Sequence, residues 1–281
     1  MRKTLVIAAV LLTSLACCSC NNAGKEDQEL VVMSYNIRNS RAKDGDNAWD
    51  VRKPATTAML DKVNPDVFGV QEAYPNQVEF ITETCPRYGS YGVGREDGVN
   101  DGEHMSIFYN KDKIELLKSG TYWLSETPDQ PTMGWDAACK RTATWALMKL
   151  KASGKKFYYV NTHLDHVGVE ARVKGLALIV DNIADMNAEG LPMVLTGDFN
   201  VEPADSCLFD LNTKMKSARE TATVSDDKPS FTGFGLYPES IIDYIYYSNF
   251  SECKDFRVVN ETFLNIPYVS DHYPIVSTLK F

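Results

Sequence analysis

The sequence predicts an α/β fold, because short apolar runs that are typical of buried strands follow segments with helical periodicity. Residues 169–187 place apolar side chains at helical spacing, and the apolar run 191–195 comes next. The same order occurs earlier, where residues 52–63 have helical spacing and residues 67–70 follow as a strand. We find no linker-like run of Pro, Gly or Ser and no repeat after residue 30. About 250 residues are enough for one large core, so we expect a single domain over residues 30–281.

The N-terminus predicts an export signal. A basic pair precedes residues 5–15, an apolar run that has the length of a signal-peptide core and is too short to span a bilayer. The small residues after it end in three closely spaced cysteines that resemble a bacterial lipobox: Cys17, Cys18 and Cys20. We expect a lipoprotein-type signal peptide over residues 1–20, a flexible tether over 21–29, and a periplasmic or cell-surface protein anchored to the membrane by a lipidated cysteine. An ordinary cleaved signal, giving a secreted or periplasmic protein, is the alternative.

The first half of the chain alternates between strands and helices. We expect strands at residues 30–35, 67–70, 88–93, 105–109 and 113–123, because these runs are apolar or β-branched. Ala55, Ala58, Met59 and Val63 share one face of the first helix, which Asn64-Pro65-Asp66 ends. A second helix is expected at residues 74–85, and an acidic, glycine-rich loop at 96–103.

The second half begins with the aromatic-rich segment 123–135, which predicts either a substrate lip or a small hydrophobic cluster. Strands are expected at residues 144–150, 157–161, 191–195, 240–247 and 256–259, with a last one after Pro274. A short helix is expected at 203–211, and irregular structure at 212–234. The helix at 169–187 has the clearest apolar stripe: Val169, Val173, Leu176, Ile179, Val180, Ile183 and Met186.

Polar side chains that suit catalysis follow the strand at 191–195. Gly197 is expected to allow a sharp turn, and Asp198 and Asn200 share one face while Phe199 points into the core. A carboxylate and an amide at a strand end suit the handling of an attacking water and a phosphoryl oxygen. An Asp/Asn turn without function is the alternative for this stretch alone.

Further polar groups lie at other strand ends. Asn36 and Glu72 follow the first two strands, His163 follows the strand at 157–161, and the pair Asp271-His272 precedes the last strand. Polar groups collect at such edges in open α/β sheets, which predicts a cleft.

The sequence also suggests the surroundings of Asp243, Arg141 and His166 in the second half of the chain. Asp243 lies among Ile and Tyr, so that its burial requires a partner such as a histidine. Arg141 by itself is interpreted as a surface residue, although its planar fork suits phosphate oxygens. His163 and His166 have metal-ligand spacing, but no third soft ligand is nearby, and we interpret His166 as a solvated loop residue.

Charge and cysteine usage exclude some functions. Without Arg2 and Lys3 the chain has 27 basic and 38 acidic residues, a net charge of about −11. Such a balance argues against tight, sequence-independent binding of nucleic acid, which needs many Lys and Arg contacts. The four cysteines beyond the signal segment have no CxxC spacing, so a zinc site is not expected: Cys85, Cys139, Cys207 and Cys253.

Taken in chain order, these motifs resemble the endonuclease–exonuclease–phosphatase superfamily, the DNase I-like fold. The motifs that carry the resemblance are Gly197-Asp198-Phe199-Asn200 and Ser270-Asp271-His272, and they are preceded by Asn36, Glu72 and His163. The likeness covers about residues 30–281 and includes an exported bacterial branch. It implies a four-layer α/β sandwich in which two central mixed sheets are flanked by helices.

The resemblance also implies a role for each residue. Mg²⁺, with Mn²⁺ as an alternative, would be bound by Glu72, with Asn36 and Asp271 close by, because hard cations prefer oxygen ligands. The other implied roles are water activation by Asp198 with Asn200, transition-state stabilisation by His272 oriented by Asp243, phosphate contacts from His163 with Glu103 as its partner, and substrate binding by Arg141 and Asn36.

Three functions remain open at this stage. The leading one is a divalent-metal-dependent phosphodiesterase or nuclease that acts outside the cytoplasm on a phosphate ester, with a small molecule as a candidate substrate. A phosphomonoesterase acting on sugar or inositol phosphates is the second, and a non-catalytic binding lipoprotein is the third. We expect a monomer.

Overall fold

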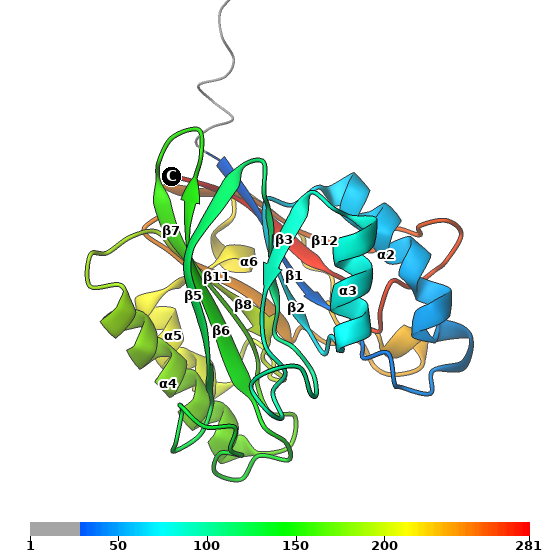
Figure 1. Ribbon diagram of the computed structural model, residues 1–281, viewed down its shortest axis with the longest axis horizontal. Helices are drawn as coiled ribbons and strands as arrows, with labels where there is room; N and C mark the ends of the chain where they lie inside the picture. The colour runs from blue at the N-terminus through cyan, green and yellow to red at the C-terminus, as the bar shows by residue number, and fades with distance from the viewer. Residues whose placement is uncertain (1–28) are drawn as a thin grey trace, which may run out of the picture.

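The computed structural model describes residues 29–281, and the fold is built on two β-sheets (Figure 1). The predicted signal peptide, the lipidated cysteine and all but the last residue of the predicted tether lie outside the described residues. None of the helices within residues 29–281 is long and apolar enough to cross a membrane.

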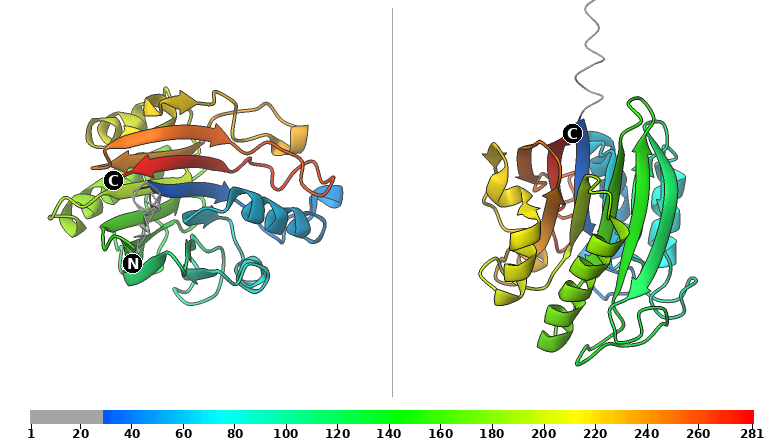
Figure 2. Two further views of the ribbon diagram at one scale, coloured as in Figure 1. Left: turned by 90° about the horizontal axis from the view of Figure 1, so that it is seen from above. Right: turned by 90° about the vertical axis from the view of Figure 1, so that its left-hand side faces the viewer.

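The first sheet has seven strands in the order β10-β12-β13-β1-β2-β4-β3. Its strands are β1 (Glu29–Asn36), β2 (Val67–Gln71), β3 (Tyr88–Tyr91), β4 (Ile107–Asn110), β10 (Val224–Ser225), β12 (Glu252–Val258) and β13 (Ile275–Lys280). The sheet is mixed, because β1 runs parallel to β2 and antiparallel to β13. Figure 2 (left) shows β13 in red between β12 in orange and β1 in blue, so the first and last strands are neighbours.

The second sheet has six strands in the order β5-β6-β7-β8-β11-β9. Its strands are β5 (Ile114–Trp123), β6 (Thr142–Leu150), β7 (Lys156–His163), β8 (Met193–Asp198), β9 (Lys216–Ser217) and β11 (Asp243–Ser248). Only β7 and β8 pair in parallel in this sheet. Parallel neighbours need a crossover connection, and α4 (Val169–Met186) supplies it here.

Helices cover the outer faces of both sheets, with α2 and α3 on one side of the molecule and α4 and α5 on the other (Figure 1). The helices are α2 (Trp49–Val63), α3 (Pro75–Thr84), α4 (Val169–Met186), α5 (Phe209–Lys214) and α6 (Ala218–Thr221), with 3₁₀ turns η1 (Gly45–Asn47), η2 (Ser206–Leu208) and η3 (Gly233–Gly235). As predicted, α2 ends before Pro65, where Asn64 adopts a left-handed conformation with φ 47°.

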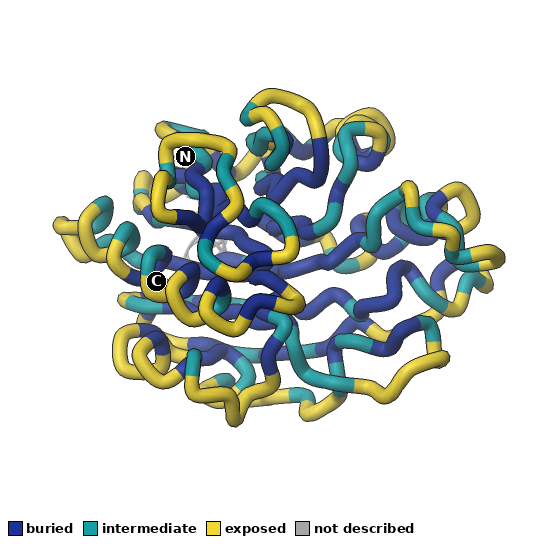
Figure 3. Tube along the Cα trace, turned by 90° about the horizontal axis from the view of Figure 1, so that it is seen from below, coloured by how far each residue is buried: buried dark blue, intermediate teal, exposed yellow. Residues whose placement is uncertain are grey.

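Three hydrophobic clusters fill the spaces between these layers. The cluster between the sheets includes Val32, Val194 and Ile245, whereas the other two lie under the helices on each outer face. Strands in the middle of the molecule are accordingly buried and the loops at the rim are exposed (Figure 3). Two mixed sheets between flanking helices confirm the predicted four-layer sandwich.

Three local predictions need correction. Val169 and Val173 are 62% and 46% exposed, so the buried stripe of α4 begins further along the helix than its periodicity suggested. The segment predicted as a short helix at 203–211 and irregular structure at 212–234 instead contains the 3₁₀ turn η2 and α5, followed by β9, α6, β10 and η3. Gly197 lies within β8 and does not turn the chain: a Cβ there would collide with the carbonyl oxygen of Thr162, and the turn comes at Asn200, where φ is 54°.

Segment 123–135 is better described as a hydrophobic cluster than as a substrate lip. Trp123 and Leu124 are buried, and the Trp123 indole N–H donates to the carbonyl oxygen of Arg95 at 2.8 Å. No residue of this segment lines the pocket described below.

Candidate active site

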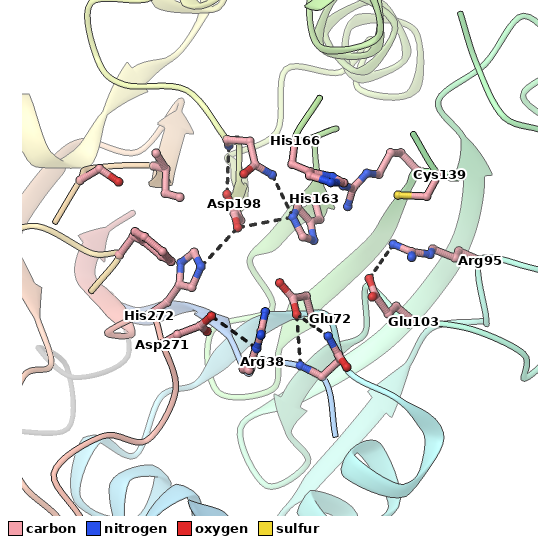
Figure 4. A pocket seen from close by; sticks show the side chains of 16 residues that line it. Arg38, Glu72, Arg95, Glu103, Cys139, His163, His166, Asp198, Asp271 and His272 are labelled. Atoms are coloured by element: carbon pink, nitrogen blue, oxygen red, sulfur yellow. Dashed lines mark hydrogen bonds and ion pairs between the residues drawn. The ribbon is translucent and has the colours of Figure 1, made fainter. Parts of the chain in front are cut away.

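A pocket of about 470 Å³ opens where strand ends from both sheets meet (Figure 4). Asn36 ends β1 and Glu72 follows β2, while His163 and Asp198 end β7 and β8. Strand register brings these groups together: His163 is paired with Asp198 across the parallel strands, and Asp243, the first residue of antiparallel β11, lies opposite Asp198. The predicted site residues that line the pocket are Glu72, Glu103, Arg141, His163, Asp198, Asn200, Asp271 and His272.

Asp198 lies at the centre of the pocket. Its Oδ1 accepts the backbone N–H of Asn200 at 3.0 Å, and its Oδ2 accepts the side-chain amide of Asn36 at 2.9 Å. The same Oδ2 lies 3.4 Å from His163 Nε2 and 3.7 Å from His272 Nε2. Burial raises the pKa of Asp198 to about 7, and the Asp243 charge adds to this although His272 opposes it. A carboxyl group in this setting can accept a proton near neutral pH.

His272 is oriented by Asp243, as the sequence predicted. Asp243 Oδ2 lies 2.8 Å from His272 Nδ1, and Phe231 packs edge-on against the imidazole at 5.0 Å between centroids. Burial lowers the pKa of His272, but Asp243, Asp198 and Asp271 outweigh it and raise the pKa to about 10. The imidazole is therefore held charged with Nε2 directed towards Asp198.

His163 has a different environment. Its Nε2 lies 3.0 Å from the side-chain nitrogen of Asn200, which also donates to the Leu164 carbonyl oxygen at 3.0 Å. Within residues 29–281, its Nδ1 is buried without a hydrogen-bond partner. Burial and the nearby guanidinium groups of Arg141 and Arg95 hold the pKa of His163 well below its usual range. The ring is therefore neutral.

The predicted pairing of Glu103 with His163 is wrong. Glu103 lines the pocket, but its Oε2 lies 2.6 Å from Arg95 Nη1 (Figure 4). The Arg95 backbone N–H also donates to the Glu103 carbonyl oxygen at 3.1 Å, so the loop between them closes on itself and directs the carboxylate to Arg95.

Glu72 and Asp271 form the oxygen-rich wall of the pocket. Glu72 has a φ of 63°, and its carboxylate accepts the Asn36 amide at 3.1 Å and two N–H groups of Asn39 at 3.1 and 3.0 Å. Burial raises the pKa of Glu72, but the charges of His272 and Arg38 and these hydrogen bonds outweigh it and lower the pKa. Burial and the Glu72 charge raise the pKa of Asp271.

These residues fit a hard divalent cation, because the nearby donors are carboxylate and amide oxygens. The Asn36 side chain connects two carboxylates, because its Nδ2 donates to both Glu72 and Asp198. Its Oδ1 accepts the Arg38 backbone N–H at 3.0 Å. Glu72 and Asp271 are therefore the first choice as ligands. A second group of potential ligand atoms lies within 4.8 Å of one another and comes from Asp198, Asp243 and His272. In this group His272 Nδ1 and Asp243 Oδ2 are already hydrogen-bonded to each other, so these two atoms are not free to bind a cation.

Arg141 is buried in the pocket wall instead of lying on the surface. Its side chain is 5% exposed, and its Nε donates to Asp165 Oδ2 at 3.1 Å. Its Nη2 lies 3.0 Å from His166 Nδ1. His166 is exposed, as predicted, but it also lines the pocket, which the sequence did not indicate. This arrangement fixes the Arg141 fork beside the pocket.

Asp165→Asn is expected to lower the free energy of unfolding by about 2 kcal/mol and to raise KM for a phosphate ester. Asp165 Oδ1 accepts the backbone N–H groups of Ala138, Val167 and Gly168, and an amide would set a donor against Arg141 Nε. Although burial raises it, the pKa of Asp165 is lowered by these hydrogen bonds and by Arg141. The folded pKa is depressed, so this stabilisation is present above the unfolded value of about 3.9 and is lost as the pH falls through the folded pKa.

Urea unfolding of this variant and of wild type at pH 7 and at about pH 2.5, which lies below the unfolded pKa of Asp, tests the prediction, with exposed Asp181→Asn as the control. The stability difference should shrink at the lower pH. An equal difference at both pH values would contradict it.

Sequence reasoning missed Arg38, Asn39, Arg95 and Asp165. Arg38 and Asn39 directly follow the strand-end residue Asn36, and Asp165 lies two residues after His163, so the strand-end rule applied a little further would have found them. Arg95 had no such signal, because its place depends on how its loop folds.

Comparisons with known proteins agree with this architecture. The model of the Endonuclease/Exonuclease/phosphatase family matches residues 33–272. An endonuclease/exonuclease/phosphatase from Bacteroides vulgatus is 38% identical, with a TM-score of 0.85 over 90% of this chain and 99% of that one. A mannosyl-6-phosphatase from Bacteroides thetaiotaomicron is 34% identical, with a TM-score of 0.85 over 90% of this chain and all of that one. An uncharacterized protein of Acanthamoeba polyphaga mimivirus is 28% identical over 81% of this chain and 91% of its own length.

The family match spans most of the chain and includes every strand-end residue that lines the pocket. The chain belongs to the Endonuclease/Exonuclease/phosphatase family, whose members hydrolyse phosphate esters and generally depend on a divalent metal.

Proposed function

We propose that this phosphoester hydrolase is a divalent-metal-dependent phosphomonoesterase that releases phosphate from sugar phosphates. The similarity to the mannosyl-6-phosphatase of Bacteroides thetaiotaomicron along the whole of that chain supports the choice. This similarity favours the phosphomonoesterase hypothesis over the phosphodiesterase or nuclease hypothesis that the sequence placed first.

The observation that carries the proposal is the charge arrangement of the pocket. Three guanidinium groups surround it: Arg38, Arg95 and Arg141. They face four carboxyl groups: Glu72, Glu103, Asp198 and Asp271. A divalent cation would make this set net positive, and a phosphomonoester carries about two negative charges at neutral pH. The pocket therefore complements a phosphate dianion once a cation is bound.

Hydrolysis uses the chain's own groups as follows. Asp198, held by Asn36 and the Asn200 backbone, accepts the proton of the attacking water. His272, held by Asp243, donates a hydrogen bond to a phosphoryl oxygen as negative charge develops.

The remaining groups orient the phosphate. His163 and Arg141 contact its far side, and the fork of Arg141 suits paired phosphate oxygens. Glu72 and Asp271 would hold Mg²⁺ or Mn²⁺, and the bound ion would supply Lewis-acid stabilisation of the phosphoryl charge.

Chelation is expected to lower the rate of phosphate release by at least about 100-fold, because the bound ion would supply Lewis-acid stabilisation of the phosphoryl charge. The purified full chain is assayed for inorganic phosphate from mannose 6-phosphate and inositol phosphate, and for nitrophenol from mono- and bis-p-nitrophenyl phosphate, with EDTA, Mg²⁺ or Mn²⁺. Restoration by Mg²⁺ together with preference for monoesters supports the proposal. Full turnover in EDTA would contradict the metal requirement, and preference for the diester would contradict the monoesterase assignment.

A phosphodiesterase remains the second candidate for one specific reason. The pocket adjoins another cavity beside Asp271, with which it shares Arg38 and Phe231, and this leaves space for a second ester group. The bis-p-nitrophenyl phosphate arm of the same assay separates the two functions.

We also propose that the protein acts outside the cytoplasm on a lipid anchor, as the sequence of residues 1–20 suggests. Metabolic labelling with palmitate tests this. Incorporation should be lost when Cys17, Cys18 and Cys20 are all replaced by Ala, and incorporation by that triple variant would exclude an anchor at this cluster.

A further inference from the structure

A second cavity of about 460 Å³ adjoins the active-site pocket. The two share Arg38, Phe231 and Asp271, so a molecule whose phosphate occupies the pocket can extend into this cavity without leaving the protein surface. In Figure 4, Arg38 and Asp271 lie next to each other at the side of the pocket, with Arg38 Nε 3.5 Å from Asp271 Oδ2. We call the second space the side cavity.

The outer wall of the side cavity is fixed in place. The backbone N–H groups of Thr232 and Gly233 donate to the Asp271 carbonyl oxygen at 2.8 and 3.0 Å, and the Thr232 hydroxyl donates to the same oxygen at 3.0 Å. Phe234, in the same loop, lies 5.7 Å from the buried guanidinium of Arg52 and packs edge-on against Tyr268. The cavity is therefore preformed and attached directly to the residue that precedes His272.

The lining combines exposed apolar surface with short polar groups. Leu236 and Tyr237 are 78% and 65% exposed and are neighbours in the lining, so they offer adjoining apolar surface to a ligand. Asp44 and Asn47 line the same cavity. Both Asp44 oxygens accept from Arg38, at 3.0 and 3.1 Å, which holds the carboxylate in one orientation with further lone pairs free.

Charge narrows the class of ligand. Arg38 and Lys43 are the cationic residues of the cavity, and Asp44 and Asp271 are its carboxylates, so the side cavity is close to neutral. It suits an uncharged group and would not favour a second phosphate or an extended polyanion. An uncharged group with an apolar face and a rim of hydroxyls matches a lining that combines aromatic and aliphatic surface with the polar side chains of Asp44 and Asn47.

We propose that the side cavity binds the pyranose ring of a phosphorylated sugar, while its phosphate occupies the active-site pocket. This rests on the proposed function and names the substrate as a hexopyranose phosphate instead of a small acyclic phosphate. In the reaction, the oxygen of water bonds to phosphorus and the bond from phosphorus to the sugar oxygen breaks. The sugar oxygen takes up a proton, and the products are the free sugar and inorganic phosphate.

Tyr237→Ala tests the proposal kinetically. KM for hexose 6-phosphates should rise about 10-fold, and kcat/KM relative to glycerol 3-phosphate should fall by a similar factor, because both esters share a primary alkoxide leaving group but only one has a ring. Phe209→Ala is the matched control, since Phe209 is an aromatic side chain with 63% exposure that lies on α5 and lines neither cavity. An equal loss on both substrates, or no loss on either, would overturn the subsite.

Binding without catalysis separates this inference from the proposed function. Saturation-transfer NMR on the full chain uses methyl hexopyranosides, which carry no phosphate, and adenosine as a flat aromatic probe. Glycoside signals that are lost in Tyr237→Ala and kept in Phe209→Ala support the subsite, even if no monoester is hydrolysed, in which case only the proposed function fails. Absence of glycoside signals in wild type, or Tyr237-dependent signals from adenosine alone, would overturn it in favour of no site or of a nucleobase site.

Discussion

Replacing Asp198 by asparagine is expected to lower kcat for phosphate release by about 10²- to 10⁴-fold, the range that a positioned general base contributes. The amide keeps the volume, but its single oxygen can accept from only one of the two donors, Asn36 Nδ2 and the Asn200 backbone N–H, which lie 2.9 and 3.0 Å from the two carboxylate oxygens. It cannot take a proton from water. Since substrate contacts are otherwise retained, KM should change far less than kcat.

Steady-state kinetics with mannose 6-phosphate, together with a thermal melt, distinguish this result from unfolding. Asp185→Asn, on the exposed side of α4, is the control for the same chemical change. His272→Ala should also remove turnover while the protein stays folded. A folded Asp198→Asn protein with wild-type kcat would remove Asp198 from the mechanism.

Arg52→Met is expected to cost about 3 kcal/mol or more in the free energy of unfolding, because it removes a donor from four backbone carbonyl groups, and only two of these, those of Val269 and Arg38, keep another donor. The Arg52 side chain is fully buried in α2 and donates to four backbone carbonyl oxygens. These acceptors belong to Asn47, Ile37, Arg38 and Val269. Methionine keeps much of the volume but satisfies none of them, so the loss reflects hydrogen bonding more than packing.

Urea unfolding followed by circular dichroism measures the loss. Lys53→Met in the same helix is the matched control, because Lys53 forms only a solvent-accessible ion pair with Asp50 at 2.7 Å, which contributes little. The two variants should differ by at least about 2 kcal/mol. Similar stabilities would mean that water replaces the Arg52 donors.

Residues at strand ends could be predicted from the sequence, and contacts made within loops could not. Asn36, His163 and Asp198 follow predicted strands within three residues and end the observed ones, and strand pairing then places His163 beside Asp198. By contrast, the Arg95–Glu103 ion pair depends on the closed shape of a loop, for which periodicity carries no information.

Burial of individual side chains showed the same limit. Val169 has the right spacing for the core side of α4 but lies at the start of the helix, where no element covers it. Arg141 has no hydrophobic pattern to mark it as buried, because its partner Asp165 comes from another loop 24 residues away. Spacing defines which face a residue occupies, whereas burial depends on what packs there.

The Asn36 amide donates both to Glu72 beside the first sheet and to Asp198 in the second, at 3.1 and 2.9 Å. Both hydrogen bonds can form only when the two sheets are correctly aligned. A slip of one sheet by a single residue, about 3.3 Å, exceeds the tolerance of a hydrogen bond and would separate the oxygen-rich wall from the proton acceptor. Substitutions in the core between the sheets can therefore reduce turnover before they produce any visible loss of folded protein.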